Sequence, residues 1–192
     1  MSFLKQLDAL QQNSLGRLSR ILLASDGTLT DVVEAAMLEP ISLKRLYVET
    51  VPPDAKMNLD LLELLDLSAR DRVMERRILL FGSRTGRNYV YAESFLALDR
   101  FPGTVIRALT ESDAPVGRIW LEHGLEGRKE LLAASCIPGN GRLAAYFPDY
   151  RDTDLVMRRY RMISGGHPVM LITEYFPATL SELPSTIPVR RS

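Results

Sequence analysis

The segment RRYRMISGGHPVMLITEYFP, residues 158–177, decides the fold of this chain. Two runs typical of β-strands, 157–163 and 169–176, flank the polar stretch 164–168, which contains a Gly-Gly pair. Glycine adopts positive φ at little cost, so the segment is predicted to form a β-hairpin with a slightly long turn. Side chains alternate between the two faces of a strand, and both faces of the second strand are largely apolar. We therefore expect this strand to lie inside a covered sheet.

One acidic residue interrupts this apolar strand. Alternation places Glu174 on the same face as Ile172 and Phe176. Burying an unpaired carboxylate is costly, so Glu174 must be paired, protonated or functional. Arg159 and Arg161 share one face of the first strand and are its candidate partners. A structural ion pair and a catalytic role for Glu174 are equally compatible with this pattern.

The composition limits the class of protein. A chain of 192 residues, 46% of them hydrophobic, is long enough for one domain with a sizeable core. Balanced charge, 24 basic against 24 acidic residues, argues against a general nucleic-acid binder. There is no apolar run of the roughly 18 residues that a membrane helix needs and no signal-peptide core. A single cysteine fits a reducing compartment, so we expect a cytoplasmic protein without a nucleic-acid or membrane partner.

The rest of the chain predicts further hairpin strands with helices between them, and hence an α+β fold: one antiparallel sheet with helices packed mainly on one face. No linker divides residues 1–192, and the tail 178–192 is expected to be loosely ordered. The remaining expected strands are 41–51, 72–81 and 89–98, and the expected helices are 3–10, 29–37, 59–67, one beginning at Pro102 and one ending at Leu131 and Leu132.

Few residue patterns indicate chemistry. There is no phosphate loop, nucleophile elbow, zinc motif or dinucleotide fingerprint, and two histidines with one cysteine form no metal cluster. Arg76, between Glu75 and Arg77, could lie on an exposed sheet edge or in a site. A small pocket that combines arginines with one acid suits a dianionic ligand, because guanidinium pairs bidentately with carboxylate.

Several segments together resemble one family, the chorismate pyruvate-lyases or 4-hydroxybenzoate synthases. The resemblance spans about residues 18–177 and is closest to the actinobacterial and cyanobacterial branch. It implies a single domain with about six antiparallel strands and an internal ligand site covered by helix-turn flaps. The segments, in chain order, are ASDGTLT at 24–30, RRILL at 76–80, YAES at 91–94, APVG at 114–117, and residues 158–177.

The resemblance also implies an activity, the conversion of chorismate to 4-hydroxybenzoate and pyruvate without a metal or organic cofactor. The carboxylate-binding arginine of the family matches Arg76, and its buried glutamate matches Glu174. Glu174, kept protonated by apolar neighbours, is expected to give a proton to the departing enolpyruvyl group. The sequence itself does not distinguish a para from a meta hydroxyl in the product, and it does not indicate the oligomeric state.

The flap contacts implied by the family fall on Thr28 and Leu29 in one flap and on Val116 and Gly117 in the other. A second family arginine, found in the proteobacterial enzymes, would align near Glu93, where this chain carries the opposite charge. Arg159 and Arg161 are then the candidates for holding the second carboxylate of the substrate.

The C-terminal hairpin also resembles the UTRA ligand-binding domains of bacterial transcription regulators, whose fold is shared. A non-catalytic sensor of an aromatic or carboxylic acid is therefore the alternative function.

Overall fold

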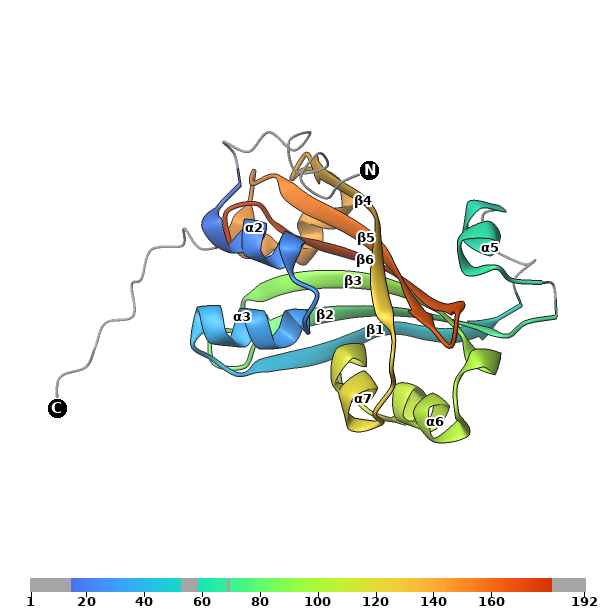
Figure 1. The fold of residues 1–192 in the computed structure, drawn as a ribbon. Coiled ribbons are helices and arrows are strands. Elements are labelled where there is room, and N and C mark those ends of the chain that lie inside the picture. Colours follow the sequence, from blue (N-terminus) through green and yellow to red (C-terminus); the bar gives the residue numbers. More distant parts are fainter. Residues whose placement is uncertain (1–14, 53–58, 69, 181–192) are drawn as a thin grey trace, which may run out of the picture.

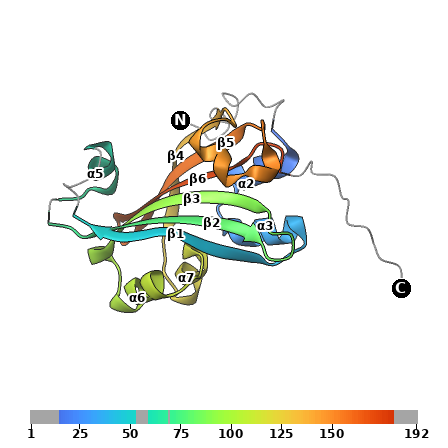
Figure 2. The ribbon, with the colours of Figure 1, turned by 180° about the vertical axis from the view of Figure 1, so that it is seen from behind.

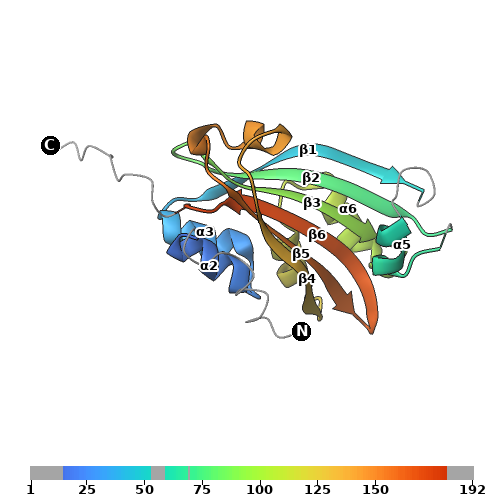
Figure 3. The same ribbon diagram turned by 90° about the horizontal axis from the view of Figure 1, so that it is seen from above.

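A computed structural model describes residues 15–52, 59–68 and 70–180. One antiparallel sheet of six strands forms the body, in the order β1-β2-β3-β6-β5-β4, as Figures 1 and 3 show. The strands are β1 (Ile41–Val51), β2 (Val73–Gly82), β3 (Asn88–Ala97), β4 (Arg128–Ile137), β5 (Leu155–Ser164) and β6 (His167–Pro177). The α-helices are α2 (Arg17–Ala24), α3 (Leu29–Met37), α5 (Leu59–Leu65), α6 (Gly103–Glu111) and α7 (Val116–Glu122), with 3-10 turns at Leu98–Arg100, Arg142–Tyr146 and Pro148–Tyr150.

Most of the helices cover one face of the sheet, which confirms the predicted α+β architecture, and α5 reaches the other face, where its Leu64 carbonyl oxygen accepts a hydrogen bond from Arg161. Helices α2 and α3 pack with the sheet in one apolar cluster, and α6 and α7 pack with it in a second. In Figure 1, α3, α6 and α7 lie on the same side of the sheet. Helix α5 stands at one end of the sheet and α2 and α3 at the other, as the rear view in Figure 2 also shows. Within the described residues, no helix is long and apolar enough to cross a lipid bilayer.

The expected strands and most of the expected helices are present, but β4 was missed. Leu131 and Leu132 belong to this strand, so the helix predicted to end there is wrong. Among the described residues, β4 is an edge strand that pairs with β5 alone, and a bulge between Leu131 and Ala133 interrupts its alternation. An edge strand with a bulge has no clean period-two pattern, which removes the signal that identified the other strands.

The sequence also predicts a helix near the N-terminus and a loosely ordered C-terminal tail. The predicted helix at residues 3–10 lies outside the described residues. Only the first three residues of the expected tail are described, and they form a turn in which Ala178 and Leu180 are buried in the core. The chain therefore remains ordered to at least Leu180.

The β5–β6 hairpin has a tighter turn than predicted. Gly165 and Gly166 adopt φ values of 57° and 84°, so Ser164 pairs directly with His167. A bulge between Met162 and Ile163 then shifts the pairing by one residue. A shift of one residue exchanges the faces of a strand.

That bulge decides which arginines face the buried acid. If the pairing set by the turn continued without a bulge, Met157 would lie opposite Glu174. Arg159 would then lie on the face of the sheet that carries Glu174. The bulge places Arg158 opposite Glu174 instead. The predicted pairing of Glu174 with Arg159 or Arg161 is therefore wrong, and Arg158 is the partner.

Candidate active site

A cavity of about 910 Å³ lies between the helix-covered face of the sheet and two helix-turn segments. Its floor consists of inward-facing residues of β2, β3, β5 and β6, including Ser94, Ile172 and Glu174. Its roof comprises two segments that we call the α3 flap, residues 26–31, and the α7 flap, residues 115–117. The start of β4 completes the wall.

The two flaps meet above the cavity. Thr28 and Leu29 in the α3 flap and Val116 and Gly117 in the α7 flap all line it. A Cβ atom on Gly117 would lie 2.7 Å from Cγ2 of Thr28, closer than side-chain atoms approach. Glycine at 117 therefore allows the flaps to close against each other.

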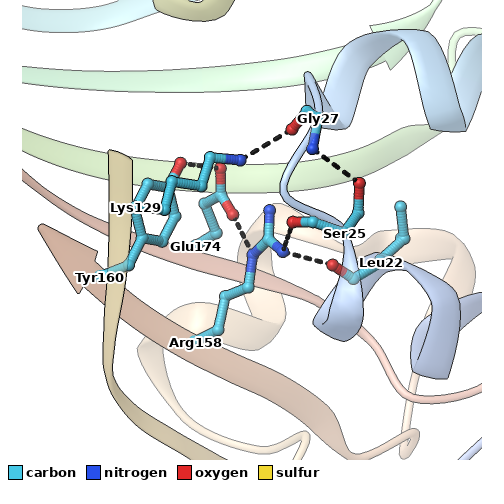
Figure 4. Close-up of polar contacts among 7 residues, drawn as sticks. All are labelled: Leu22, Ser25, Gly27, Lys129, Arg158, Tyr160 and Glu174. Carbon is cyan, nitrogen blue, oxygen red and sulfur yellow. Dashed lines mark hydrogen bonds and ion pairs between the residues drawn. The ribbon is translucent and has the colours of Figure 1, made fainter. Parts of the chain in front are cut away.

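Glu174 lies on the cavity floor with only 6% of its surface exposed. Its Oε2 accepts a hydrogen bond of 2.5 Å from Nε of Arg158, and its Oε1 accepts one of 2.9 Å from the hydroxyl of Tyr160 (Figure 4). The acid that the sequence placed among apolar neighbours therefore also has a cationic partner.

Arg158 also connects the acid to the segment that leads into the α3 flap. Its Nη1 donates to the carbonyl oxygen of Leu22 and, at 3.1 Å, to that of Ser25 (Figure 4). Burial lowers the pKa of Arg158, but Glu174, together with Tyr160 and Asp26, outweighs that effect, and the pKa of Arg158 is raised. The end of helix α2 is thus fixed to the same guanidinium that holds Glu174.

Tyr160 and Lys129 complete the surroundings of the acid. Burial and the neighbouring Glu174 charge raise the pKa of Tyr160 well above its usual value, so the phenol stays a neutral donor. Nζ of Lys129 lies 5.1 Å from the centre of the Tyr160 ring and donates a hydrogen bond of 2.7 Å to the carbonyl oxygen of Gly27 (Figure 4). Neither residue was predicted, because the first depends on the bulge and the second on the missed strand β4.

Arg76 lies on the same face of the sheet as Glu174, opposite Ser94 in the β2–β3 register. It is fully buried and does not itself line the cavity, although Ser94 opposite it does. Its Nη2 donates a hydrogen bond of 3.0 Å to the carbonyl oxygen of Ala114, just before the α7 flap. Within the described part of the chain, Nε and Nη1 have no hydrogen-bond partner. The surface-edge alternative for Arg76 is thereby excluded.

The charges around Arg76 do not neutralise the positive charge of its guanidinium. Burial and the nearby charge of Arg45 lower the pKa of Arg76 to about 10, and Asp113 offsets part of this. Asp113 itself is engaged by Arg45 at 2.7 Å. At neutral pH the guanidinium of Arg76 is charged, buried and only partly hydrogen-bonded, an arrangement that favours binding of an anion.

Three other predicted site residues lie on the opposite face of the sheet. Glu93 accepts a hydrogen bond from the hydroxyl of Tyr91, Arg159 donates to Thr173, and Arg161 pairs with Glu130. None of the three lines the cavity. The bulge places Arg159 and Arg161 on the face away from the cavity, and strand alternation does the same for Glu93. Their assignment to the substrate site is therefore corrected.

Metal ligands are not gathered in the part of the chain that the structure describes: no group of three or more His, Cys, Asp or Glu side chains could hold an ion there. The cavity instead combines one buried carboxylate, Glu174, with Lys129 in its lining, whereas the other lining carboxylates, Asp26, Asp31 and Glu126, are exposed. Such a site can bind an anionic ligand, orient it, and move a proton at Glu174.

Comparison with known protein families shows which family this chain matches. The family model described as chorismate pyruvate-lyase, Rv2949c-like, matches residues 23–183. The chain belongs to this family. It is therefore a lyase. A chorismate pyruvate-lyase of Mycobacterium tuberculosis H37Rv is 34% identical over 162 residues, covering 84% of this chain and 80% of the relative. One from Mycobacterium leprae is 35% identical over 166 residues, covering 84% of this chain and 75% of the relative.

Solved structures with the same fold are the UTRA-type ligand-binding domains of GntR regulators. The effector domain of PhnF from Mycobacterium smegmatis aligns with a TM-score of 0.63 at 13% identity, covering 80% of this chain and 90% of that one. The ligand-binding domain of a GntR-family regulator from Bordetella bronchiseptica aligns with a TM-score of 0.56 at 17% identity, covering 71% and 84%. At these identities the likeness supports the fold alone.

Proposed function

We propose that this lyase eliminates enolpyruvate from chorismate to give 4-hydroxybenzoate and pyruvate, without a metal or organic cofactor. The observation that carries the proposal is a buried carboxylate, Glu174, on the floor of a 910 Å³ cavity that Lys129 also lines, with Arg76 buried on the same face of the sheet. Chorismate carries one carboxylate on its ring and one on its enolpyruvyl arm, so cations near the acid suit it. The single cysteine favours the cytoplasm as the place of this reaction.

The bond changes explain why so few groups are needed. The ring C–O bond to the enolpyruvyl arm breaks, and its electron pair stays on the oxygen. The neighbouring ring carbon, which carries the hydroxyl, loses its hydrogen as a proton, and that C–H pair completes the aromatic ring. Aromatisation supplies much of the driving force, so the protein has to orient the substrate and handle one proton.

Glu174 is the group proposed to handle that proton. Paired with Arg158, it is a carboxylate before the reaction and can accept the ring proton as a general base. It can then donate the proton to the departing enolpyruvate oxygen, which is the donor role expected from the sequence. Enolpyruvate tautomerises to pyruvate after release, and Glu174 returns to its ionised form.

Arg76 is proposed to bind the ring carboxylate. Its Nε and Nη1 are buried without a hydrogen-bond partner within the described residues, and its Nη2 donates to Ala114, next to the α7 flap. A small displacement of this flap would open the guanidinium to the ligand. Closure of both flaps over the bound ring would then exclude water and could limit product release.

The test is turnover by the purified protein. Incubation with chorismate and a chelator should give pyruvate and 4-hydroxybenzoate in equal amounts, quantified by lactate dehydrogenase coupling and by chromatography. The Glu174→Gln protein is the matched control and should give neither product at a comparable rate. Formation of 3-hydroxybenzoate, or a rate abolished by the chelator, would contradict the proposed product or the absence of a cofactor.

The likeness to regulator effector domains favours a second candidate, a sensor of small carboxylic acids. Such a protein would bind 4-hydroxybenzoate tightly and leave chorismate unchanged. The same incubation separates the two functions, because a sensor gives binding without pyruvate.

A further inference from the structure

Lys129 occupies an unusual place for a lysine. It is the second residue of the edge strand β4 and lines the cavity. Figure 4 shows its side chain beside Tyr160, with the ammonium group between Glu174 and the loop at Gly27. It is only partly exposed. An edge-strand lysine normally extends into solvent, so this inward position calls for a partner.

The partner that the protein provides is incomplete. Among the described residues, the one hydrogen bond of the Lys129 ammonium goes to the neutral carbonyl oxygen of Gly27, and no carboxylate lies within ion-pair distance. Burial and the charge of Arg158 lower the pKa of Lys129, while Glu174 and Asp26 offset part of that effect. An ammonium group has three donors, so Lys129 can bind an anion without losing its contact with Gly27.

The position of Lys129 mirrors that of Arg76. In the strand order, β2 and β4 lie on opposite sides of β6, which carries Glu174, each two strands away. Each cation is also held by a backbone carbonyl of a different roof segment: Arg76 by Ala114 before the α7 flap, and Lys129 by Gly27 in the α3 flap. A ligand with two carboxylates could therefore connect both flaps across Glu174.

We propose that Lys129 binds the second carboxylate of the ligand, the one on the departing arm. This inference rests on the proposed function, since it assigns Arg76 to the ring carboxylate. It gives Lys129 the role that the sequence left to Arg159 or Arg161. It also makes the site selective for a dianion, because 4-hydroxybenzoate retains only the ring carboxylate and pyruvate carries the other away.

The test measures binding, so that it does not depend on turnover. The probes are 4-hydroxybenzoate, with one carboxylate, and 3-(carboxymethoxy)-4-hydroxybenzoate, which adds an unreactive carboxylate on an ether arm. Titration calorimetry should show that Lys129→Met weakens the dicarboxylate by about 10- to 100-fold, the scale of one charge-assisted hydrogen bond. The affinity for 4-hydroxybenzoate should stay within about twofold, because its only carboxylate is bound elsewhere.

The matched control is Lys44→Met on β1, the opposite edge strand, where the lysine is exposed and remote from the cavity. It should leave both affinities unchanged. Lys129→Arg keeps the positive charge and should restore most of the dicarboxylate affinity, which covers the case in which the methionine variant does not fold.

Two outcomes would overturn the inference: equal loss of both ligands in Lys129→Met, or no preference of the unmodified protein for the dicarboxylate. Either result would count against Lys129 even if chorismate is converted. Conversely, a preference for the dicarboxylate that depends on Lys129, without any release of pyruvate from chorismate, would retain the binding site and reject the proposed reaction.

Discussion

Two buried arginines lie on the same face of the sheet and differ in how they are bonded. Arg158 donates to the carboxylate of Glu174 and to two backbone carbonyls, and only its Nη2 lacks a partner within the described residues. Arg76 donates to one backbone carbonyl, and two of its three nitrogens lack a partner there. The first arginine is compensated by the fold and the second is not.

This difference separates two uses of the same residue type. A buried cation that the protein itself neutralises holds structure together, here the acid and the end of helix α2. A buried cation that the protein leaves partly unbonded reduces stability until an anion arrives. Arg158 is therefore a positioning residue for Glu174, and Arg76 is the proposed ligand-binding residue.

The largest expected effect concerns the acid itself. Glu174→Gln removes the group that accepts and returns the proton, so kcat should fall by about 100- to 10,000-fold. It also leaves Arg158 without a counter-charge, so the free energy of unfolding should drop by about 3 kcal/mol. Both are measured on one sample by pyruvate release and chemical denaturation. Glu93→Gln, on the opposite face, is the matched control, and a folded Glu174→Gln protein with normal turnover would rule out the proposed role.

Replacing Arg158, whose charge is neutralised by Glu174, should mainly lower the stability of the fold. Arg158→Met leaves the Glu174 carboxylate buried and unpaired, which should lower the free energy of unfolding by about 3–5 kcal/mol. Arg159→Met, one residue further along the same strand and exposed on the other face, should cost far less. Urea denaturation of the two variants checks this, and similar losses in both would mean that the comparison between faces is wrong.

Changing the uncompensated arginine should instead affect the substrate. Arg76→Lys keeps the charge but loses the planar fork, so kcat/KM should fall by an amount equivalent to roughly 1.5–3 kcal/mol, with little change in unfolding. Arg77→Lys, which faces the other side of the sheet, is the control. Steady-state kinetics on chorismate measure the effect, and unaltered kinetics in Arg76→Lys would remove Arg76 from the site.

The smallest expected effect concerns the contact between the two flaps. Gly117→Ala places a methyl group against Thr28 and should keep the flaps apart, raising KM for chorismate by about 3- to 10-fold, an energy of roughly 1 kcal/mol. Gly103→Ala in helix α6, where an added methyl group meets no atom within 4 Å, should leave KM unchanged. Equal KM values in the two variants would show that the flaps do not need to meet.

The features that could be predicted from the sequence are those with a local signal. The alternation of β6 identified Glu174 as a buried acid, and the Gly-Gly pair identified the hairpin that carries it. The flap residues and Arg76 came from resemblance to a family rather than from pattern. Glu174 and its hairpin lie in a segment whose local sequence specifies the structure without reference to a distant partner.

The remaining features depend on register and on tertiary packing. The bulge between Met162 and Ile163 exchanges the faces of β5, so Arg158 rather than Arg159 meets the acid. No pattern in the sequence marks that bulge, because the residues on both sides of it are apolar. Lys129 was missed because β4 is an irregular edge strand, and only its pairing with β5 brings the lysine to the cavity.

The central claim is that Arg76 remains partly unbonded because it binds a carboxylate of the ligand. Thermal unfolding of Arg76→Met, with and without 4-hydroxybenzoate, tests this most directly. Without ligand the variant should melt no lower than the unmodified protein, since an uncompensated buried cation has been replaced by an apolar side chain. With 4-hydroxybenzoate the unmodified protein should gain stability and the variant should not. A variant that melts well below the unmodified protein and is still stabilised by 4-hydroxybenzoate would contradict the claim.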